Sequence, residues 1–408
     1  MQLSKKKRNL ALIFVSFTMG MLYFIPYIRF TFYDQTLEVF GINNTQMGIL
    51  GSVYGLIAIC GYFVSGILCN RFEPRKLLAL SSAATGAITL WLAQIPSFGS
   101  LVAIYAMYSV FTIATAWSPY MVICRSLGSE EEQSRIFGIS DALRNVFSAL
   151  AGFAFIWLFS LFANIYVGYK GMLLVSVGLY FIFAVLCFVI LPNVNKETAV
   201  ETETADNKAK LSDVLKTPGV WLMGIFIFSC YNAVVTQANY LGTFTTQLGV
   251  DVTISSSLAI VRAYVLSVLA GLLGGYILDK AKSRVVALGI MAGLLAVSCI
   301  LVPLLETSMW ITVVLTMFIS MFAMILLATY WSIMGDCGIP MEYTALASGL
   351  ISCIAYIPDA YVTVLIGRWL DADISTGFTK MFVWMAAWAV IAVIMAAVIY
   401  KREKKMQK

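Results

Sequence analysis

The chain has 408 residues, of which 61% are hydrophobic and only 12% are charged. Soluble domains average about 45–50% apolar and about 25% charged residues, so one aqueous core cannot bury this much apolar surface. The apolar residues are numerous enough for roughly a dozen membrane spans of about 20 residues each. The composition therefore predicts a polytopic membrane protein and excludes secreted disulfide scaffolds, nucleic-acid-binding proteins and cytosolic enzymes.

Twelve apolar runs are long enough to cross a bilayer, and prolines or short polar segments separate them. We expect each run to form a helix, because a lone spanning segment must satisfy its own backbone. The runs are 9–32, 46–69, 77–95, 99–123, 136–163, 171–191, 219–241, 255–278, 285–305, 309–334, 344–370 and 377–400. The polar segment 193–217 predicts a cytoplasmic linker between two six-helix halves, 1–192 and 218–408.

Lys and Arg residues are distributed unevenly between the predicted loops. With the N-terminus in the cytoplasm, 21 of the 27 lie on the cytoplasmic side, and only Lys170 and Lys380 lie outside. Positive charge concentrates in cytoplasmic loops, so both termini are predicted to be cytoplasmic. The basic start leads into the first apolar run without a small-residue cleavage site, which predicts a retained helix rather than a signal peptide.

Residues for metal, redox or nucleotide chemistry are scarce. The eight cysteines lie in apolar runs or at their inner ends, so no disulfide is expected. The sequence has no histidine, its cysteines lack metal-site spacing, and it has no phosphate-binding Gly-x-x-x-x-Gly-Lys motif. We therefore expect no cofactor, no metal and no direct use of ATP. Any proton transfer near neutral pH must use carboxylates.

The two halves of the sequence contain related segments about half a chain length apart. Residues 66–76 end the second span, and 275–284 end the eighth. Each contains a glycine followed, four positions later, by Asn70 or Asp279 and then by basic residues. Duplicated six-helix bundles are typical of transporters.

These segments resemble the loop motif of the major facilitator superfamily, and the resemblance extends over essentially the whole chain. The second copy, from Gly275 to Arg284, matches the family pattern Gly-x-x-x-Asp-Arg/Lys. The first copy has Asn70 in place of the acid, so the motif's ion pair is expected only at Asp279. The resemblance implies 12 transmembrane helices in two pseudo-symmetric bundles and transport by alternating access.

Two narrower resemblances concern branches of this superfamily. Residues 70–75 resemble the Asp-Arg-x-Asn-Pro-Arg motif of the organophosphate:phosphate antiporters. Residues 262–264, 131–138 and 357–360 resemble the YihN/YqcE-type branch. The seventh span carries no basic residue, whereas the antiporters place a second phosphate-binding arginine there, so organophosphate exchange is less favoured than the loop motif suggests.

Five ionisable residues within the predicted spans are functional candidates, since each costs roughly 2.5–3.5 kcal/mol to insert. They are Arg29, Asp141, Arg144, Arg262 and Asp359. Their charges leave a surplus of one positive charge, which favours an anionic solute. Asp141 and Arg144 are three residues apart and are predicted to pair on one helix face, either as a structural pair or in gating and coupling. Asp359 is the strongest candidate for carrying a proton.

Arg29 and Arg262 are the predicted anion-binding residues, one in each half. We expect Arg29 in the outer part of a continuous first helix and Arg262 about 12 Å below the outer surface. In the organophosphate antiporters an arginine at a position similar to Arg29 meets the substrate phosphate. Without solute, both guanidinium groups are expected to contact Asp359 or tyrosines such as Tyr27 and Tyr231. The alternatives are an arginine that snorkels to the headgroups and an ion pair that only joins helices.

Neutral polar residues in the seventh span suit the hydroxyl, amide or carbonyl groups of a solute, with polar contacts between helices as the alternative. Asn232 and Gln237 are the candidates among them. Charged and polar residues at the inner helix ends are expected to hold the inward-closed state. These gating candidates are Asn70, Arg71, Arg75, Asp279, Lys280 and Arg284.

The sequence thus predicts a secondary active transporter in the cytoplasmic membrane of a bacterium. It would move a small anionic or zwitterionic solute, driven by proton coupling or solute exchange. The alternative is a transporter-like sensor that binds the solute without moving it. An enzyme is not expected, because the sequence has no nucleophile–base pair or metal motif. The expected partners are the solute, the lipid bilayer and protons, with no nucleic acid, and the chain is expected to be a monomer.

Overall fold

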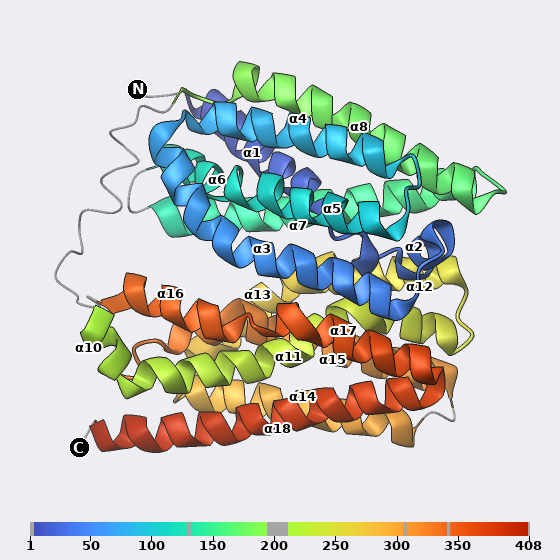
Figure 1. Cartoon of the computed structure of the whole chain (residues 1–408). Coiled ribbons are helices and arrows are strands. Elements are labelled where there is room, and N and C mark those ends of the chain that lie inside the picture. Colours follow the sequence, from blue (N-terminus) through green and yellow to red (C-terminus); the bar gives the residue numbers. More distant parts are fainter. Residues whose placement is uncertain (1–3, 129–131, 194–210, 306–307, 341–342, 407–408) are drawn as a thin grey trace. The chain divides into compact units, whose positions relative to one another are not determined.

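The computed structural model describes residues 4–128, 132–193, 211–305, 308–340 and 343–406 (Figure 1). All the regular elements in these ranges are helical. Ten of the described helices are long and apolar enough to cross a membrane. The first and third predicted spans are also helical, but each of these helices has basic residues in its first turn, and neither is among the ten. The predicted all-α fold is confirmed.

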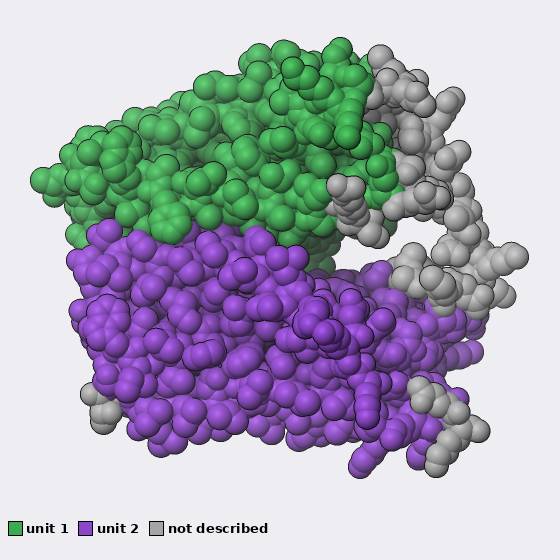
Figure 2. Space-filling model, turned by 180° about the vertical axis from the view of Figure 1, so that it is seen from behind, with its two compact units in different colours: residues 1–42, 49–205 green, residues 43–48, 206–408 purple. Residues whose placement is uncertain are grey.

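The chain divides into two compact units (Figure 2). Unit 1 comprises residues 1–42 and 49–205, and unit 2 comprises residues 43–48 and 206–408. Most of the predicted linker lies outside the described residues. Its last part forms a short helix, α10, directly before the first long helix of unit 2.

Unit 1 contains the first six predicted spans, two of them interrupted by a turn of different helical type. Its elements are α1 (Lys5–Phe24), η1 (Ile28–Phe30), α2 (Tyr33–Phe40), α3 (Asn44–Arg71, whose first five residues belong to unit 2), α4 (Pro74–Leu92), α5 (Phe98–Ser109), η2 (Val110–Ala114), α6 (Trp117–Ser126), α7 (Gln133–Ser160) and α8 (Ile165–Ile190).

Unit 2 contains the last six spans, three of which are interrupted. Its elements are α10 (Leu211–Lys216), α11 (Pro218–Gln247), α12 (Val252–Ile260), η4 (Val261–Val265), α13 (Leu266–Lys280), α14 (Arg284–Leu304), α15 (Met309–Thr329), η5 (Tyr330–Ile333), α16 (Thr344–Ala355), α17 (Pro358–Ala372) and α18 (Ile374–Met406).

Helix packing repeats between the units. In unit 1 the third and sixth spans, α4 and α8, pack along each other, and in unit 2 the corresponding spans, α14 and α18, do the same. The first span of each unit also packs against the fifth, α1 against α7 and α11 against α16 and α17. This repeated packing agrees with the two pseudo-symmetric bundles predicted from the sequence repeat.

The sequence sets many helix starts locally. Asn164 and Asp251 each accept hydrogen bonds from two backbone N–H groups at the start of α8 and α12, and Ser283 accepts one at the start of α14. Pro74 and Pro218 begin α4 and α11, where a missing N–H costs no helical bond. Four of these five helices begin within three residues of the predicted start, whereas α8 begins at Ile165, six residues before the predicted start at 171.

The predicted first span, 9–32, is wrong in its outer part. Helix α1 ends at Phe24, and Pro26 follows, which has no N–H to donate and clashes with a preceding carbonyl. The chain then forms the tight turn η1, in which Ile28 donates its N–H to the Ile25 carbonyl at 3.0 Å. The eleventh span is also broken, between Ala355 at the end of α16 and Pro358 at the start of α17.

Within unit 2, the start of α3 is held by the end of α17. The Asp371 carboxylate accepts hydrogen bonds from the backbone N–H groups of Asn44 and Thr45 at 3.0 and 2.8 Å. It also accepts hydrogen bonds from the side chains of these two residues. It therefore caps a helix start that is far away in sequence. Glycine allows this approach, because a Cβ on Gly367 would lie 2.5 Å from the Asn44 carbonyl oxygen and one on Gly48 would lie 2.4 Å from the Thr363 carbonyl oxygen.

We expect Gly367→Ala to lower the thermal unfolding midpoint of the purified protein. The added methyl group forces a backbone shift, and such overpacking typically costs about 1–3 kcal/mol. Gly271→Ala is the matched control, since a Cβ on this α13 glycine meets nothing within 4 Å. The control is expected to leave the midpoint unchanged or slightly higher. Equal midpoints for the two variants would contradict the close contact.

Candidate functional site

In unit 1, Arg29 lies in the turn η1 and not on a continuous first helix as predicted. Its side chain is 5% exposed, and its Nη1 donates to the Pro26 carbonyl at 3.1 Å. The guanidinium carbon lies 5.2 Å from the centre of the Tyr27 ring and 4.9 Å from that of Phe30. A Cβ on Gly51 would lie 3.4 Å from the guanidinium group. The break at Pro26 therefore supplies both the carbonyl and the aromatic faces that hold Arg29.

Tyrosines that the sequence analysis did not single out extend this cluster. The Tyr54 ring lies 5.1 Å from that of Tyr27, and its hydroxyl shares a 2.7 Å hydrogen bond with Thr112 in the π-helical turn η2. Arg29 also interacts with the Tyr105 hydroxyl. These residues come from three different spans, so local spacing could not have revealed them.

Asp141 and Arg144 on α7 form the predicted ion pair. Asn145 also donates its side-chain amide to Asp141 at 3.2 Å. Arg144 additionally interacts electrostatically with Tyr23 and Tyr120 in the same unit. The acidic partner of this arginine thus lies within one turn of its own helix.

In unit 2, Arg262 lies in the π-helical turn η4, between α12 and α13. Its side chain is 3% exposed, and its Nη1 donates to the Thr316 hydroxyl on α15 at 3.2 Å. Its Nη2 is buried and has no hydrogen-bond partner among the residues that the structure describes. Within the described residues it forms no ion pair, so neither Asp359 nor Tyr231 is its partner, contrary to prediction.

Gln237 on α11 shows a second unmatched donor in the same unit. Its side chain is 2% exposed, and its Oε1 accepts the Ser320 hydroxyl at 2.8 Å. Its Nε2 is buried, and none of the described residues is its hydrogen-bond partner. Ser320 lies one helical turn beyond Thr316 on α15. The sequence carried a signal for both hydroxyl residues, since Thr312, Thr316 and Ser320 recur every four positions in an otherwise apolar span.

Polar contacts also connect α11 to α17 just after the break in the eleventh span. Tyr231 donates to the Asp359 carboxylate at 3.0 Å, and Tyr361 donates to the Asn232 side-chain carbonyl at 2.8 Å. The ring of Tyr356, at the break, lies 4.7 Å from that of Tyr231. The predicted candidates Tyr231, Asn232 and Asp359 thus lie together in unit 2, with two tyrosines that were not predicted.

Among the predicted gating residues the ion pairs differ from expectation. Asp279, Lys280 and Arg284 are exposed, and within the described residues Asp279 forms no ion pair. In the first copy Glu73 pairs with Arg75 and with Lys76. The expectation that Asp279 alone keeps the motif's acid–base pair is therefore wrong, because Glu73 precedes the start of α4 by one residue and reaches the two basic side chains of its first turn. Arg71 is exposed at the end of α3, and the side chain of Asn70 lies outside the described residues.

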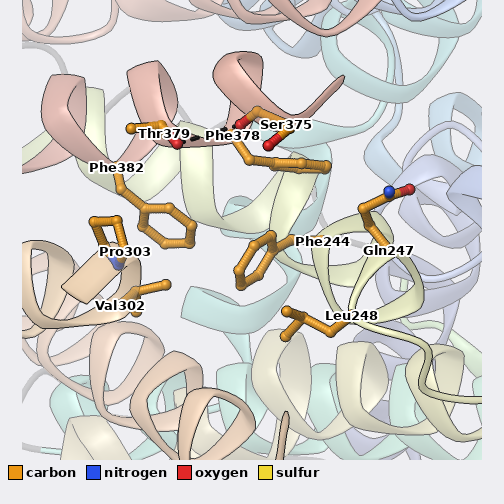
Figure 3. A pocket seen from close by; sticks show the side chains of 9 residues that line it. All are labelled: Phe244, Gln247, Leu248, Val302, Pro303, Ser375, Phe378, Thr379 and Phe382. Carbon is orange, nitrogen blue, oxygen red and sulfur yellow. Dashed lines mark hydrogen bonds between the residues drawn. The ribbon is translucent and has the colours of Figure 1, made fainter. Parts of the chain in front are cut away.

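A pocket of about 110 Å³ lies within unit 2 near the ends of α11, α14 and α18 (Figure 3). Its walls carry no charged side chain and none of the predicted site residues. They consist of Phe244, Gln247, Leu248, Val302, Pro303, Ser375, Phe378, Thr379 and Phe382. This pocket therefore offers an anion no positive charge.

The chain is similar to membrane transporters over nearly its whole length. Residues 9–363 match the family model of the Major Facilitator Superfamily. Inner membrane protein YqcE of Escherichia coli (strain K12) is 28% identical over 386 residues, covering 91% of this chain and 89% of that protein. Inner membrane protein YihN of the same organism is 23% identical over 403 residues, covering 95% and 94%.

The crystal structure of the nucleoside transporter NupG has the same fold, with a TM-score of 0.74 at 13% identity over 97% of this chain and 99% of that chain. The resemblance to this superfamily inferred from the loop motif is thus confirmed, as is the resemblance to its YihN/YqcE-type branch inferred from residues 131–138, 262–264 and 357–360. A family model that covers most of the chain, inner-membrane relatives and a transporter fold lead to one conclusion: the chain belongs to the Major Facilitator Superfamily and is a multi-pass membrane transporter.

Proposed function

We propose that the protein moves a small organic anion or zwitterion across the membrane by alternating access, driven by protons or by solute exchange. The observation that carries this proposal is the Arg262 guanidinium, which is buried within a spanning segment and has no acidic partner among the described residues. An uncompensated cation is unfavourable at such a site. A solute anion would supply the missing charge and accept the free N–H.

The contacts between α11 and α17 support a solute that also carries a hydroxyl or amine group. The Asp359 carboxylate and the Asn232 carbonyl are acceptors beside the break in the eleventh span. Asp359 is also our candidate for proton coupling, because the sequence has no histidine and carboxylates remain the groups available. In unit 1, Arg29 with Tyr27 and the Asp141–Arg144 pair are proposed as secondary contacts and coupling groups.

We further propose that both termini are cytoplasmic, as the Lys and Arg distribution predicts. In this orientation, the exposed residues Arg71, Asp279, Lys280 and Arg284 and the Glu73–Arg75 pair lie at the cytoplasmic helix ends. There they would stabilise the conformation that is closed to the cytoplasm, and solute binding would shift the balance between the two conformations.

Counterflow in proteoliposomes tests the proposed transport. We expect wild-type protein to exchange a labelled organic anion and Arg262→Ala to lose about 10- to 100-fold in apparent affinity, since hydrogen bonds to charged groups contribute about 1.5–3 kcal/mol. Arg262→Lys keeps the charge but loses the planar guanidinium group, so its apparent affinity should lie between those of the wild type and Arg262→Ala. Arg368→Ala, which removes an exposed arginine from α17, is the control.

Two outcomes would contradict the proposal. Wild-type affinity in Arg262→Ala would show that Arg262 does not bind the anion. Anion binding without any counterflow would favour a sensor instead of a transporter.

A second prediction concerns proton coupling. We expect Asp359→Asn to abolish accumulation of the solute driven by a pH gradient, because the amide cannot exchange a proton, while counterflow without a gradient continues. Tyr231→Phe removes the hydrogen bond to Asp359 but keeps the carboxylate, so it should retain accumulation with a shifted pH dependence. Accumulation by Asp359→Asn at the wild-type level would assign coupling to another group or to solute exchange.

A further inference from the structure

The two unmatched donors of unit 2 lie along the same helix. Arg262 and Gln237 each bind α15 through one polar atom, to Thr316 at 3.2 Å and to Ser320 at 2.8 Å. Residues four apart lie on one helix face with Cβ atoms about 5–6 Å apart. Arg262 and Gln237 therefore bind α15 at positions that lie one helical turn apart.

Each of the two side chains has one nitrogen that makes no hydrogen bond to the described residues. Arg262 Nη2 and Gln237 Nε2 are both buried and without a partner in the described part of the chain, and both side chains are more than nine-tenths buried. Buried donors are nearly always satisfied in native proteins, so unsatisfied ones need an explanation. Here the two side chains that carry such donors bind the same stretch of α15 from two other elements, α11 and η4.

The composition of this site restricts the charge of its ligand. Arg262 contributes one positive charge, while Gln237, Thr316 and Ser320 are neutral. A monovalent anion would balance that charge. A phosphate ester carries about −1.5 to −2 at neutral pH and would leave negative charge uncompensated in a buried site, which is unfavourable.

Resting on the proposed anion transport, we propose that Arg262 and Gln237 form a subsite for a single carboxylate group of the solute. One carboxylate oxygen accepts from Arg262 Nη2 and the other from Gln237 Nε2, so that two donors match two oxygens. Thr316 and Ser320 position the two side chains and do not contact the solute. The substrate class is therefore a monocarboxylate, and phosphate esters are excluded.

A Gln237→Glu variant tests this pairing in the full-length protein. Glutamate has nearly the shape of glutamine and places a carboxylate beside Arg262, where it acts as the missing anion. We expect the thermal unfolding midpoint to rise by a few degrees and acetate to lose its stabilising effect. If Gln237 had only a structural role, the unfolding midpoint of this variant would fall, because a new buried charge without a partner lowers stability.

Asn239→Asp is the matched control on the same helix. This side chain is also 2% exposed, but its amide already donates to the Val235 carbonyl at 2.7 Å. Two residues along α11 correspond to a rotation of about 200°, so the new acid points away from α15. It should lower the midpoint and leave the acetate response intact. A rise in both variants would show that acidity in general, and not the pairing with Arg262, stabilises the protein.

Three probes that each carry one methyl group separate the anion classes at constant ionic strength: acetate, methanesulfonate and methyl phosphate. We expect acetate to raise the midpoint of the wild-type protein, methanesulfonate to raise it less, and methyl phosphate to have no effect beyond chloride. A larger shift with methyl phosphate would overturn the carboxylate assignment, and so would the absence of any shift with acetate.

The transport assay distinguishes failure of this subsite from failure of the proposed function. If anions exchange in counterflow and depend on Arg262, but Gln237→Glu behaves like wild type, the subsite is wrong and the proposed function stands. If no anion exchanges in wild-type proteoliposomes, the proposed function itself fails.

Discussion

Water is absent from the hydrocarbon core of a bilayer, so every polar group placed there must find a partner within the protein or its ligand. Long helices meet this requirement for most of the backbone. The interruptions at η1, η4 and the break before Pro358 expose backbone groups, and each of them lies at or next to a charged residue: Arg29, Arg262 or Asp359. At these three of the five interrupted spans, irregular backbone and charged residues thus occur together, because both need a surrounding of polar partners or solute.

Most buried hydroxyl groups in the described residues are satisfied, either by a carbonyl one turn earlier or by another side chain. The hydroxyl of Ser16, for example, bonds to its own helix and to Ser140, which also binds Tyr120. Such contacts hold helices together without requiring a ligand. Against this background an unsatisfied guanidinium nitrogen is informative, since an arginine with a structural role would be expected to have a nearby acid or carbonyl.

Hydropathy, proline and capping residues were sufficient to predict the helices and most of their limits, because these signals act within a few residues. The Asp141–Arg144 pair was predictable for the same reason. The end of the first helix was missed because the apolar run continues past Pro26, although a helical backbone cannot continue through this proline. The contacts of Arg262 with Thr316 were not predictable in detail, since 54 residues separate the two and only the folded unit brings them together.

Arg29 and Arg262 look equivalent in sequence, but the protein surrounds their positively charged guanidinium groups with different contacts. A guanidinium has five N–H donors and a planar face. Arg29 uses a backbone carbonyl, two aromatic rings and the Tyr105 hydroxyl, so a solute anion must compete with contacts that already exist. Arg262 has one hydroxyl contact among the described residues, so an anion gains its interaction without displacing a partner. The larger share of anion-binding free energy is therefore expected in unit 2, while Arg29 is better suited to hold the aromatic rings around it.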